Sequence, residues 1–533
     1  MTSTSPDHSM LVVVVGLVGF LALLYWWTKP THPFPPGPKR LPIIGNMLDL
    51  PKDHAWFTYQ QWSKEYRSDV IHVDTLGTHL IILNSAKAAR ELFEKRSSLY
   101  SDSSFFIVLH HRLRCMLKLD WAFGFAPYGQ ELRRHRKVLH RYFSPAASEQ
   151  YHQIEAKATL ELLQRLLDTP QDFVAHLRHM AGRTILEIAY GIEAQPRNDP
   201  YINIVEKAIK AMTVGATQRA RVFDTFPICT ASFYFFLRSF LDIHGTYAVA
   251  RLPEYLPGMS IKREAKKWSS QCALTVEMPF RAVKEAIASG SAKESVASSL
   301  LQNGGEDGSP YDEDVAKKAI ASMYLGKSTP STINTFILLM VLYPEVQQKA
   351  HAEIDAIIGH GRLPKHSDES LLPYVGAVVK EVLRWAPIAP LGVPHSVLSD
   401  DIYKGYLIPA GSVVLGNCWA ILHDETMFPD PDAFKPERFL DTGGGATSDY
   451  PDAAFGFGRR VCPGRFMAHA AVWLAIVSIL STFDISKAVD EDGNEIVPAG
   501  EFIDGLIMYP APFKCRIEPR STSAVSLIRT ASA

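Results

Sequence analysis

Cysteine is scarce in this sequence, and no two of its cysteines form a C-x-x-C pair. That spacing argues against a disulfide framework and against a zinc site. Most of the cysteines are expected to be small buried hydrophobic residues. The six are Cys115, Cys229, Cys272, Cys418, Cys462 and Cys515. Cys462 is the exception, because it lies among glycines and arginines in FGFGRRVCPG, residues 455–464.

The chain also lacks an excess of charge of either sign. It has 55 Lys and Arg against 56 Asp and Glu, a formal net charge of -1. Nucleic acid is therefore not expected as a partner. With 533 residues, 47% of them hydrophobic, the chain is long enough to bury a large core. No internal repeat is present.

No Lys or Arg precedes the apolar run near the N-terminus. Residues 10–28 are long and apolar enough for a single transmembrane helix, with residues 1–9 in the lumen. Lys29, Lys39 and Arg40 follow the run, which predicts that the rest of the chain faces the cytoplasm. A cleaved signal peptide is the alternative, but its basic region and small-residue cleavage site are missing.

The hydrophobic pattern predicts a mainly helical α+β body. Residues 29–42 are rich in proline and are expected to form a stiff hinge between the membrane and the body. The body is predicted to occupy residues 43–519, and residues 520–533 are expected to be a disordered tail.

Short strands are expected at both ends of a long helical region. Alternating apolar residues predict strands at 70–76 and 79–84. Residues 343–359 are typical of a helix with proline in its first turn and a glycine stop. Strands are expected again within 400–417 and 502–519.

The surroundings of Cys462 favour a metal-binding thiolate. Arg459, Arg460 and Arg465 are nearby cations, which favour the thiolate form. Backbone N–H groups of a glycine-rich loop can point at the sulfur, and an apolar helix begins after Gly464. A single cysteine without a protein co-ligand indicates a cofactor that supplies the other ligands, and haem fits. The alternative is a chance cysteine in a glycine-rich loop.

This stretch resembles the haem-binding signature of the cytochromes P450, the haem-thiolate monooxygenases. Phe455, Gly458, Arg460, Cys462 and Gly464 match that long and specific motif. The resemblance covers essentially the whole chain and is strongest to microsomal fungal members, including those of wood-rotting basidiomycetes. It implies the cytochrome P450 fold and haem b, with Cys462 as the axial iron ligand and Arg460 at a haem propionate.

Two further motifs stand upstream in the family's order. EVLR contains Glu381 and Arg384, three residues apart, and PERF contains Arg438. The family implies a buried ion triad of these side chains that supports the cysteine loop. Glu381 and Arg384 would share one helical face, and buried charges must be paired.

The resemblance also implies further propionate partners. His395 stands where the family usually has arginine or histidine, and Arg136 is retained. Leu132 occupies the position of a tryptophan in the family pattern, so one donor is missing. The hydroxyl of Tyr128 or the charge of Arg133 are candidate substitutes.

The distal motif departs from the family, which places an acidic residue before a threonine to relay protons to bound O₂. A count without gaps puts the threonine position on Ser328 and the acid on Lys327. A two-residue deletion would instead keep Ser328 and Thr329 as the hydroxyl pair. In either case the carboxylate is missing. Pro330 is expected to enforce a bend, because proline displaces the carbonyl of Gly326.

Residues 223–258 are longer than the corresponding loop of the family and carry a dense aromatic run. They could dip into the membrane and guide a lipophilic substrate. Core packing or a translated intron is the alternative, and lost codons are an alternative for the distal motif.

The resemblance implies a monooxygenase of the endoplasmic reticulum membrane that inserts one oxygen atom from O₂ into a small molecule. Apolar segments at 103–113, 323–328, 387–393 and 502–507 favour a neutral lipophilic substrate such as a terpenoid, steroid or polyaromatic, in secondary metabolism or detoxification. No flavin or nicotinamide fingerprint is present. Electrons from NADPH are thus expected through a separate NADPH–cytochrome reductase, with cytochrome b5 as a further candidate.

Two rival hypotheses remain open at this stage. A haem-thiolate enzyme that rearranges or dehydrates its substrate would need no proton relay, which suits the missing carboxylate. An inactive haem-binding protein or a faulty gene product would suit the altered distal motif and the long insertion.

Overall fold

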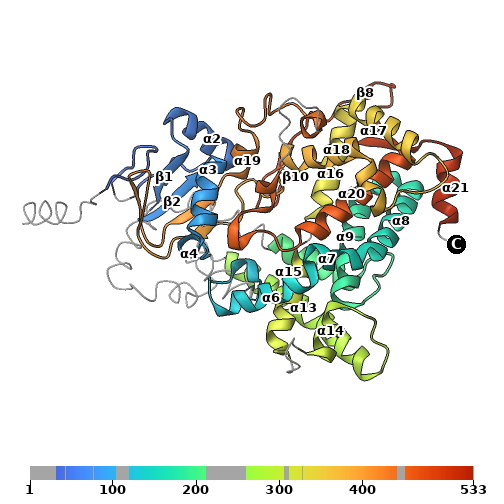
Figure 1. Ribbon diagram of the computed structural model, residues 1–533, viewed down its shortest axis with the longest axis horizontal. Coiled ribbons are helices and arrows are strands. Elements are labelled where there is room, and N and C mark those ends of the chain that lie inside the picture. Colours follow the sequence, from blue (N-terminus) through green and yellow to red (C-terminus); the bar gives the residue numbers. More distant parts are fainter. Residues whose placement is uncertain are drawn as a thin grey trace, which may run out of the picture.

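The computed structural model is a helix-rich body with a smaller strand-rich part, as the sequence predicts (Figure 1). The strand-rich part contains the N-terminal end of the described chain, and helices make up most of the rest. The residues described are 32–531 without 104–118, 120, 212–259, 305–310, 441–450 and the single positions 43, 76 and 327. The expected membrane helix and the 223–258 insertion lie outside them.

The main sheet joins segments far apart in the sequence. β1 (Val70–Thr75) pairs with β2 (Thr78–Leu83), antiparallel, which confirms the two predicted strands. β2 runs parallel to β6 (Val413–Gly416), and β3 (His395–Ser396) closes the order β1-β2-β6-β3. Residue 395 therefore lies in the same sheet as the N-terminal strands, with β6 between them.

The smaller strand pairs are β4 (Asp401–Tyr403) with β5 (Tyr406–Ile408), β7 (Phe483–Val489) with β8 (Glu495–Ile496) and β11 (Cys515–Pro519), and β9 (Phe502–Ile503) with β10 (Tyr509–Pro510). They confirm strands within 400–417 and 502–519 and add β7 and β8, which were not predicted from the sequence.

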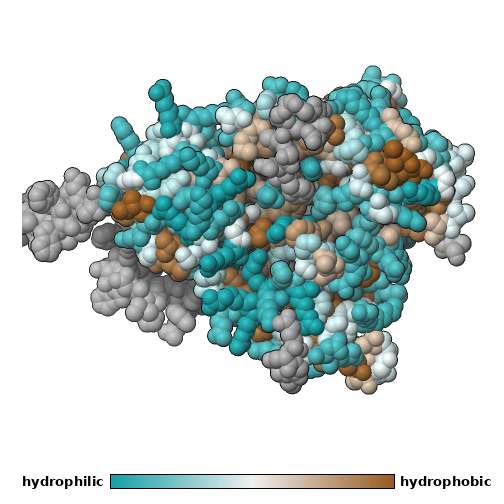
Figure 2. Space-filling model, in the orientation of Figure 1, coloured by the Kyte–Doolittle hydropathy of each residue, from teal (hydrophilic) through white to brown (hydrophobic). Residues whose placement is uncertain are grey.

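The helical core is built around α20 (Arg465–Thr482). It packs against α8 (His152–Asp168) and α16 (Thr329–Leu342), and its residues 470–480 are all buried. Among the described residues, α20 is the only helix long and apolar enough to span a membrane, and 67% of it is buried within the protein. Burial identifies it as a core helix. The hydrophilic face in Figure 2 carries only separate hydrophobic patches.

Other helices pack around this core or beside the strand-rich part. α17 (Pro344–Ile357) begins at proline and is followed by Gly359 in a left-handed conformation, as its sequence predicts. The others are α2 (Ala55–Glu65), α3 (Ala86–Ala89), α4 (Ser97–Tyr100), α6 (Gln130–Phe143), α7 (Pro145–Ser148), α9 (Phe173–Tyr190), α13 (Ser260–Ala288), α14 (Val296–Asn303), α15 (Glu313–Leu325), α18 (Pro373–Trp385), α19 (Cys418–Leu422) and α21 (Thr522–Thr530).

The described part of the proline-rich segment is bound to the body. The carbonyl of Pro36 accepts from His72 N at 2.9 Å, and that of Pro33 accepts from Leu407 N at 2.8 Å. A Cβ at Gly37 would lie 2.1 Å from the His72 carbonyl oxygen, so glycine permits this close approach. Residues 32–42 thus follow the sheet instead of standing away from it as a spacer.

The C-terminal segment is ordered, which corrects the expected disordered tail over residues 520–531. α21 begins with Ser521 as N-cap, packs against α8 and α20, and buries Ile528 completely. Arg529 pairs with Asp168, and Arg520 pairs with Asp355 at 2.6 Å. An amphipathic face thus holds this helix on the core.

We predict that Ile528→Ala destabilises the protein, because it leaves a cavity between α21 and the core. A buried isoleucine cut to alanine costs about 2–5 kcal/mol of unfolding free energy. The exposed Ser526→Ala on the same helix is the control. Thermal unfolding of both variants checks the prediction, and equal midpoints would contradict the anchoring of α21.

Candidate functional site

The loop that carries Cys462 is shaped by a backbone hydrogen bond and by two glycines with positive φ. Cys462 N donates to the Phe455 carbonyl at 2.8 Å, which closes the loop. Gly456 and Gly458 have φ of 83° and 53°, in the left-handed region. A Cβ at Gly458 would lie 2.1 Å from the carbonyl oxygen of Phe93, so that position admits only glycine.

The Cys462 side chain is half-buried at the start of α20. Burial raises the pKa of its thiol above the ordinary value. A hydrogen bond from the Gly464 backbone and the charges of Arg136 and Arg465 act in the opposite direction. These are the donors and cations that stabilise a thiolate when a metal ion displaces the proton.

The backbone beside Cys462 is open at Gly464. A Cβ added at Gly464 would meet no atom within 4 Å, so the backbone here borders open space next to the Cys462 loop. Arg136 lies close by, and its Nη2 donates to the Val461 carbonyl at 3.0 Å. A thiol, a cation and an unfilled glycine surface are thus brought together.

Arg460 binds backbone carbonyls of the chain between residues 101 and 126. Its guanidinium donates to the carbonyls of Ser101 (2.9 Å), Gly124 (3.3 Å) and Ala126 (2.6 Å). Burial lowers its pKa to about 10, and the carboxylate of Asp102 opposes that shift. Asp102 was not predicted from the sequence, because the effect of its carboxylate on Arg460 depends on a contact across the fold.

His395 is buried in β3 and stacks on Phe93, with 4.0 Å between ring centroids. Nδ1 lies 2.6 Å from the Tyr100 carbonyl, an arrangement that assigns the ring proton to Nδ1. Burial lowers the pKa of His395 to about 4, and Arg460 adds to the shift. The neutral ring would therefore have only an Nε2 lone pair to offer, and it can donate to an anion there only after protonation.

The position of the missing tryptophan is filled by the buried Leu132. Both candidate substitutes lie in one group of side chains with Arg459. The Tyr128 hydroxyl accepts a hydrogen bond from Arg459. Arg133 is exposed, and its guanidinium lies 5.7 Å from the centroid of the Tyr128 ring. The two arginines thus engage Tyr128 at the surface.

The predicted ion triad is formed and buried. Arg384 Nε and Nη2 donate to the two oxygens of Glu381 at 2.7 and 2.9 Å, and both side chains are 0% exposed. Arg438 Nε donates to Glu381 Oε1 at 3.0 Å. The backbone N–H of Lys435 adds a fourth donor at 2.8 Å. The buried Glu381 carboxylate is tolerated because four N–H groups donate hydrogen bonds to its oxygens.

The remaining donors of the triad bind backbone carbonyls. Arg384 Nη1 donates to Leu422 at 3.0 Å, and Arg438 Nη1 donates to Pro429 at 2.9 Å. Both arginines also reach the Ala433 carbonyl, at 3.4 and 3.2 Å. The triad therefore ties α18 to the chain on both sides of residue 430.

The distal helix is interrupted where the sequence predicts a bend. α15 ends at Leu325 and α16 begins at Thr329, with Pro330 in its first turn. Proline costs nothing there, because first-turn N–H groups have no helical partner. The result is thus a complete break and not a bend within one helix. Ser328 and Thr329 are half-buried at the break, and Lys327 lies outside the described residues.

Three of the apolar segments expected around a substrate meet beside this break. Ser331 Oγ donates to the Met508 carbonyl, and Met508 N donates to the Ile388 carbonyl at 2.8 Å. Leu325 and Leu506 pack in one apolar cluster. The fourth segment, 103–113, lies almost wholly outside the described residues.

Comparison with known proteins identifies the family. The family model for cytochrome P450 matches residues 35–515. The chain belongs to the cytochrome P450 family. Such proteins hold haem through a cysteine thiolate and use O₂ with electrons from a reductant.

Fungal P450 monooxygenases resemble the chain over nearly its full length. Cytochrome P450 monooxygenase ple1 of Rhodocybe pseudopiperita is 39% identical over 527 residues, 97% of this chain and 96% of the relative. Cytochrome P450 monooxygenase 98 of Postia placenta is 37% identical, covering 98% and 97%. Tryptamine 4-monooxygenase of Psilocybe cyanescens is 35% identical, covering 96% and 98%.

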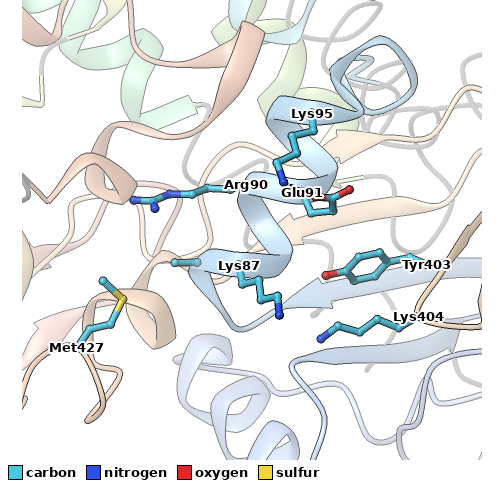
Figure 3. A pocket seen from close by; sticks show the side chains of 8 residues that line it. Lys87, Arg90, Glu91, Lys95, Tyr403, Lys404 and Met427 are labelled. Carbon is cyan, nitrogen blue, oxygen red and sulfur yellow. Dashed lines mark ion pairs between the residues drawn. The ribbon is translucent and has the colours of Figure 1, made fainter.

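A surface pocket of this P450, about 640 Å³ in volume, is lined in part by the segment 90–95, whose Phe93 carbonyl faces Gly458 of the cysteine loop (Figure 3). Two of its cations have partners: Lys95 pairs with Glu91 at 3.0 Å, and Lys404 pairs with Asp69 at 2.7 Å. The pocket is lined by Ala86, Lys87, Arg90, Glu91, Lys95, Tyr403, Lys404 and Met427. No predicted site residue is among them, so loop geometry and not this pocket locates the P450 site.

We predict that Glu381→Gln prevents stable haem incorporation. Loss of one partner from a buried ion network costs about 3–5 kcal/mol, because it leaves the arginine charges unpaired. Glu495→Gln is the control, since it weakens an exposed pair with Lys487 worth about 0–1 kcal/mol. Haem per protein checks both variants. A normal haem content in Glu381→Gln would contradict the structural role of the triad.

Proposed function

We propose that this P450 monooxygenase inserts one oxygen atom from O₂ into a neutral lipophilic small molecule, with Cys462 as the iron ligand. The cysteine loop carries the proposal, because it places a thiol beside Gly464 and the Arg136 charge at the border of open space. When bound, thiolate-ligated haem supplies the O₂ chemistry, since the thiolate favours O–O cleavage.

The residues of this chain would bind and orient that group. The Gly464 N–H and Arg136 stabilise negative charge on the Cys462 sulfur. Arg460 is the proposed propionate partner, and His395 would join it only when its Nε2 is protonated. Phe455 and Gly458 shape the loop. An arginine presents five N–H donors, so Arg460 and Arg136 retain donor capacity beyond their carbonyl contacts.

A neutral substrate is supported by the segments that meet at the distal break. Residues 387–393 carry no charged side chain, and 502–507 carry only Asp504. The Asp504 carboxylate accepts from the backbone N–H of His54 at 2.9 Å, so it is already engaged. Asp504 is the only carboxylate in these two segments, so most of their surface is apolar and suits a terpenoid, steroid or polyaromatic.

Electrons are proposed to come from NADPH through a separate reductase, with cytochrome b5 as a further donor. Arg133, Arg134 and Arg459 are exposed near the cysteine loop and would attract an acidic partner face. Residues 10–28 are the proposed anchor in the endoplasmic reticulum membrane. A role in secondary metabolism or detoxification is consistent with a lipophilic substrate.

Incorporation of labelled oxygen tests this function directly. The full chain with a reductase and NADPH is given isotopically labelled O₂ and a panel of neutral terpenoids, steroids and polyaromatics, with tryptamine as the charged comparison. One labelled atom in a neutral product is expected. A product without label would favour rearrangement or dehydration, and labelled product from tryptamine alone would overturn the neutral substrate class.

We predict that Ser328 and Thr329 deliver protons through their hydroxyls. The double variant Ser328→Ala/Thr329→Ala should reduce product formed per NADPH by about 10²–10⁴-fold if general acid catalysis is lost completely. More reduced oxygen should then appear as peroxide. Ser331→Ala is the control, because its hydroxyl is bound to Met508. Unchanged coupling in the double variant would sink this role.

A further inference from the structure

A cluster of two histidines and a glutamate lies outside the haem site. His152 is the first residue of α8, and Glu155 follows one turn later. His366 is the first residue of the short helix η5 (His366–Leu371). One ligand atom from each side chain lies within 4.8 Å of the other two.

The carboxylate of this cluster is buried without a hydrogen bond. Glu155 is 1% exposed, and neither of its oxygens has a hydrogen-bond partner among the described residues. His366 Nε2 lies 2.8 Å from Glu155 Oε2 but also lacks hydrogen-bond geometry. A buried carboxylate in this condition is costly, and an ion is one of the few groups that remove the cost.

The two imidazoles are close enough to share a metal ion, but they lie face to face. Their rings stack with centroids 3.8 Å apart and an angle of 4° between planes. Coordination by both rings requires only rotation of one ring out of the stack.

A second carboxylate stands behind the cluster. Glu369 follows His366 by three residues, which places the two on one face of a 3₁₀ helix. Glu369 Oε1 lies 2.6 Å from Nε2 of His469 on α20. This carboxylate therefore pairs with a histidine outside the cluster. The cluster thus connects α8 and η5 to the helix that begins after the cysteine loop.

We propose that His152, Glu155 and His366 bind one divalent transition metal ion of the zinc class. Two imidazoles and a carboxylate are a zinc ligand set that leaves a fourth position open. Calcium and magnesium prefer all-oxygen sites, which this cluster does not offer. The cysteine spacing argued against a zinc site, and this one uses no cysteine. Bound metal would fasten α8 to η5.

Zinc titration of the untagged, haem-loaded full chain tests the site. After dialysis against a chelator, calorimetry and elemental analysis should give one Zn²⁺ per chain. His152→Ala and His366→Ala should each weaken that binding by at least about 100-fold, because each removes a ligand. His360→Ala is the matched control, since that imidazole is exposed and outside the cluster. Saturating zinc should raise the thermal midpoint of the native chain and the control only.

Each outcome decides the proposal. No stoichiometric zinc uptake by the native chain would overturn it and would leave the cluster a buried ion pair of Glu155 with His366. Uptake unchanged in both histidine variants would also overturn it. Glu155→Gln keeps the side-chain volume, and its zinc affinity decides the case if an alanine variant loses its haem. Zinc binding is measured without turnover, so the result is independent of the proposed oxygenation.

Discussion

The Glu381 carboxylate is the constraint on which the functional half of the molecule depends. It is 0% exposed and is neutralised by Arg384 and Arg438. These arginines fix the chain between residues 422 and 438 through backbone carbonyls. Ala377 of α18 then packs in one cluster with Phe457 of the cysteine loop. A buried network of this kind specifies one arrangement, because any other leaves charge unpaired.

A second constraint joins the cysteine loop to the strand-rich part. The Phe93 carbonyl faces Gly458, where a Cβ would lie at 2.1 Å, and the Phe93 ring stacks on His395. His395 is held in turn by β6, which pairs with the N-terminal β2. One aromatic residue therefore sets the loop against the sheet. Glycine in the signature is required by this close approach as well as by its backbone conformation.

Local pattern predicted much of the fold and the cofactor. Alternation located β1 and β2, and the signature with its two upstream motifs pointed to the haem-thiolate family and to the triad. Contacts distant in sequence were not predictable. The Pro36 carbonyl accepts a hydrogen bond from His72 N in the sheet. The buried side chain of Ile528 holds α21 on a core that is distant in sequence. Ser521 and its apolar spacing were the only local signals for that helix. The His152 cluster likewise requires two elements that only the fold brings together.

The difference spectrum of the reduced, carbon monoxide-bound full chain tests the central claim most directly. The proper sample is microsomes from cells that express the full chain, because this protein includes residues 10–28. A strongly red-shifted, thiolate-type band is predicted, since Cys462 would then hold the iron. That band would also mean that the interrupted distal helix is compatible with a formed site. A band typical of lost thiolate ligation, or no band, would contradict the account.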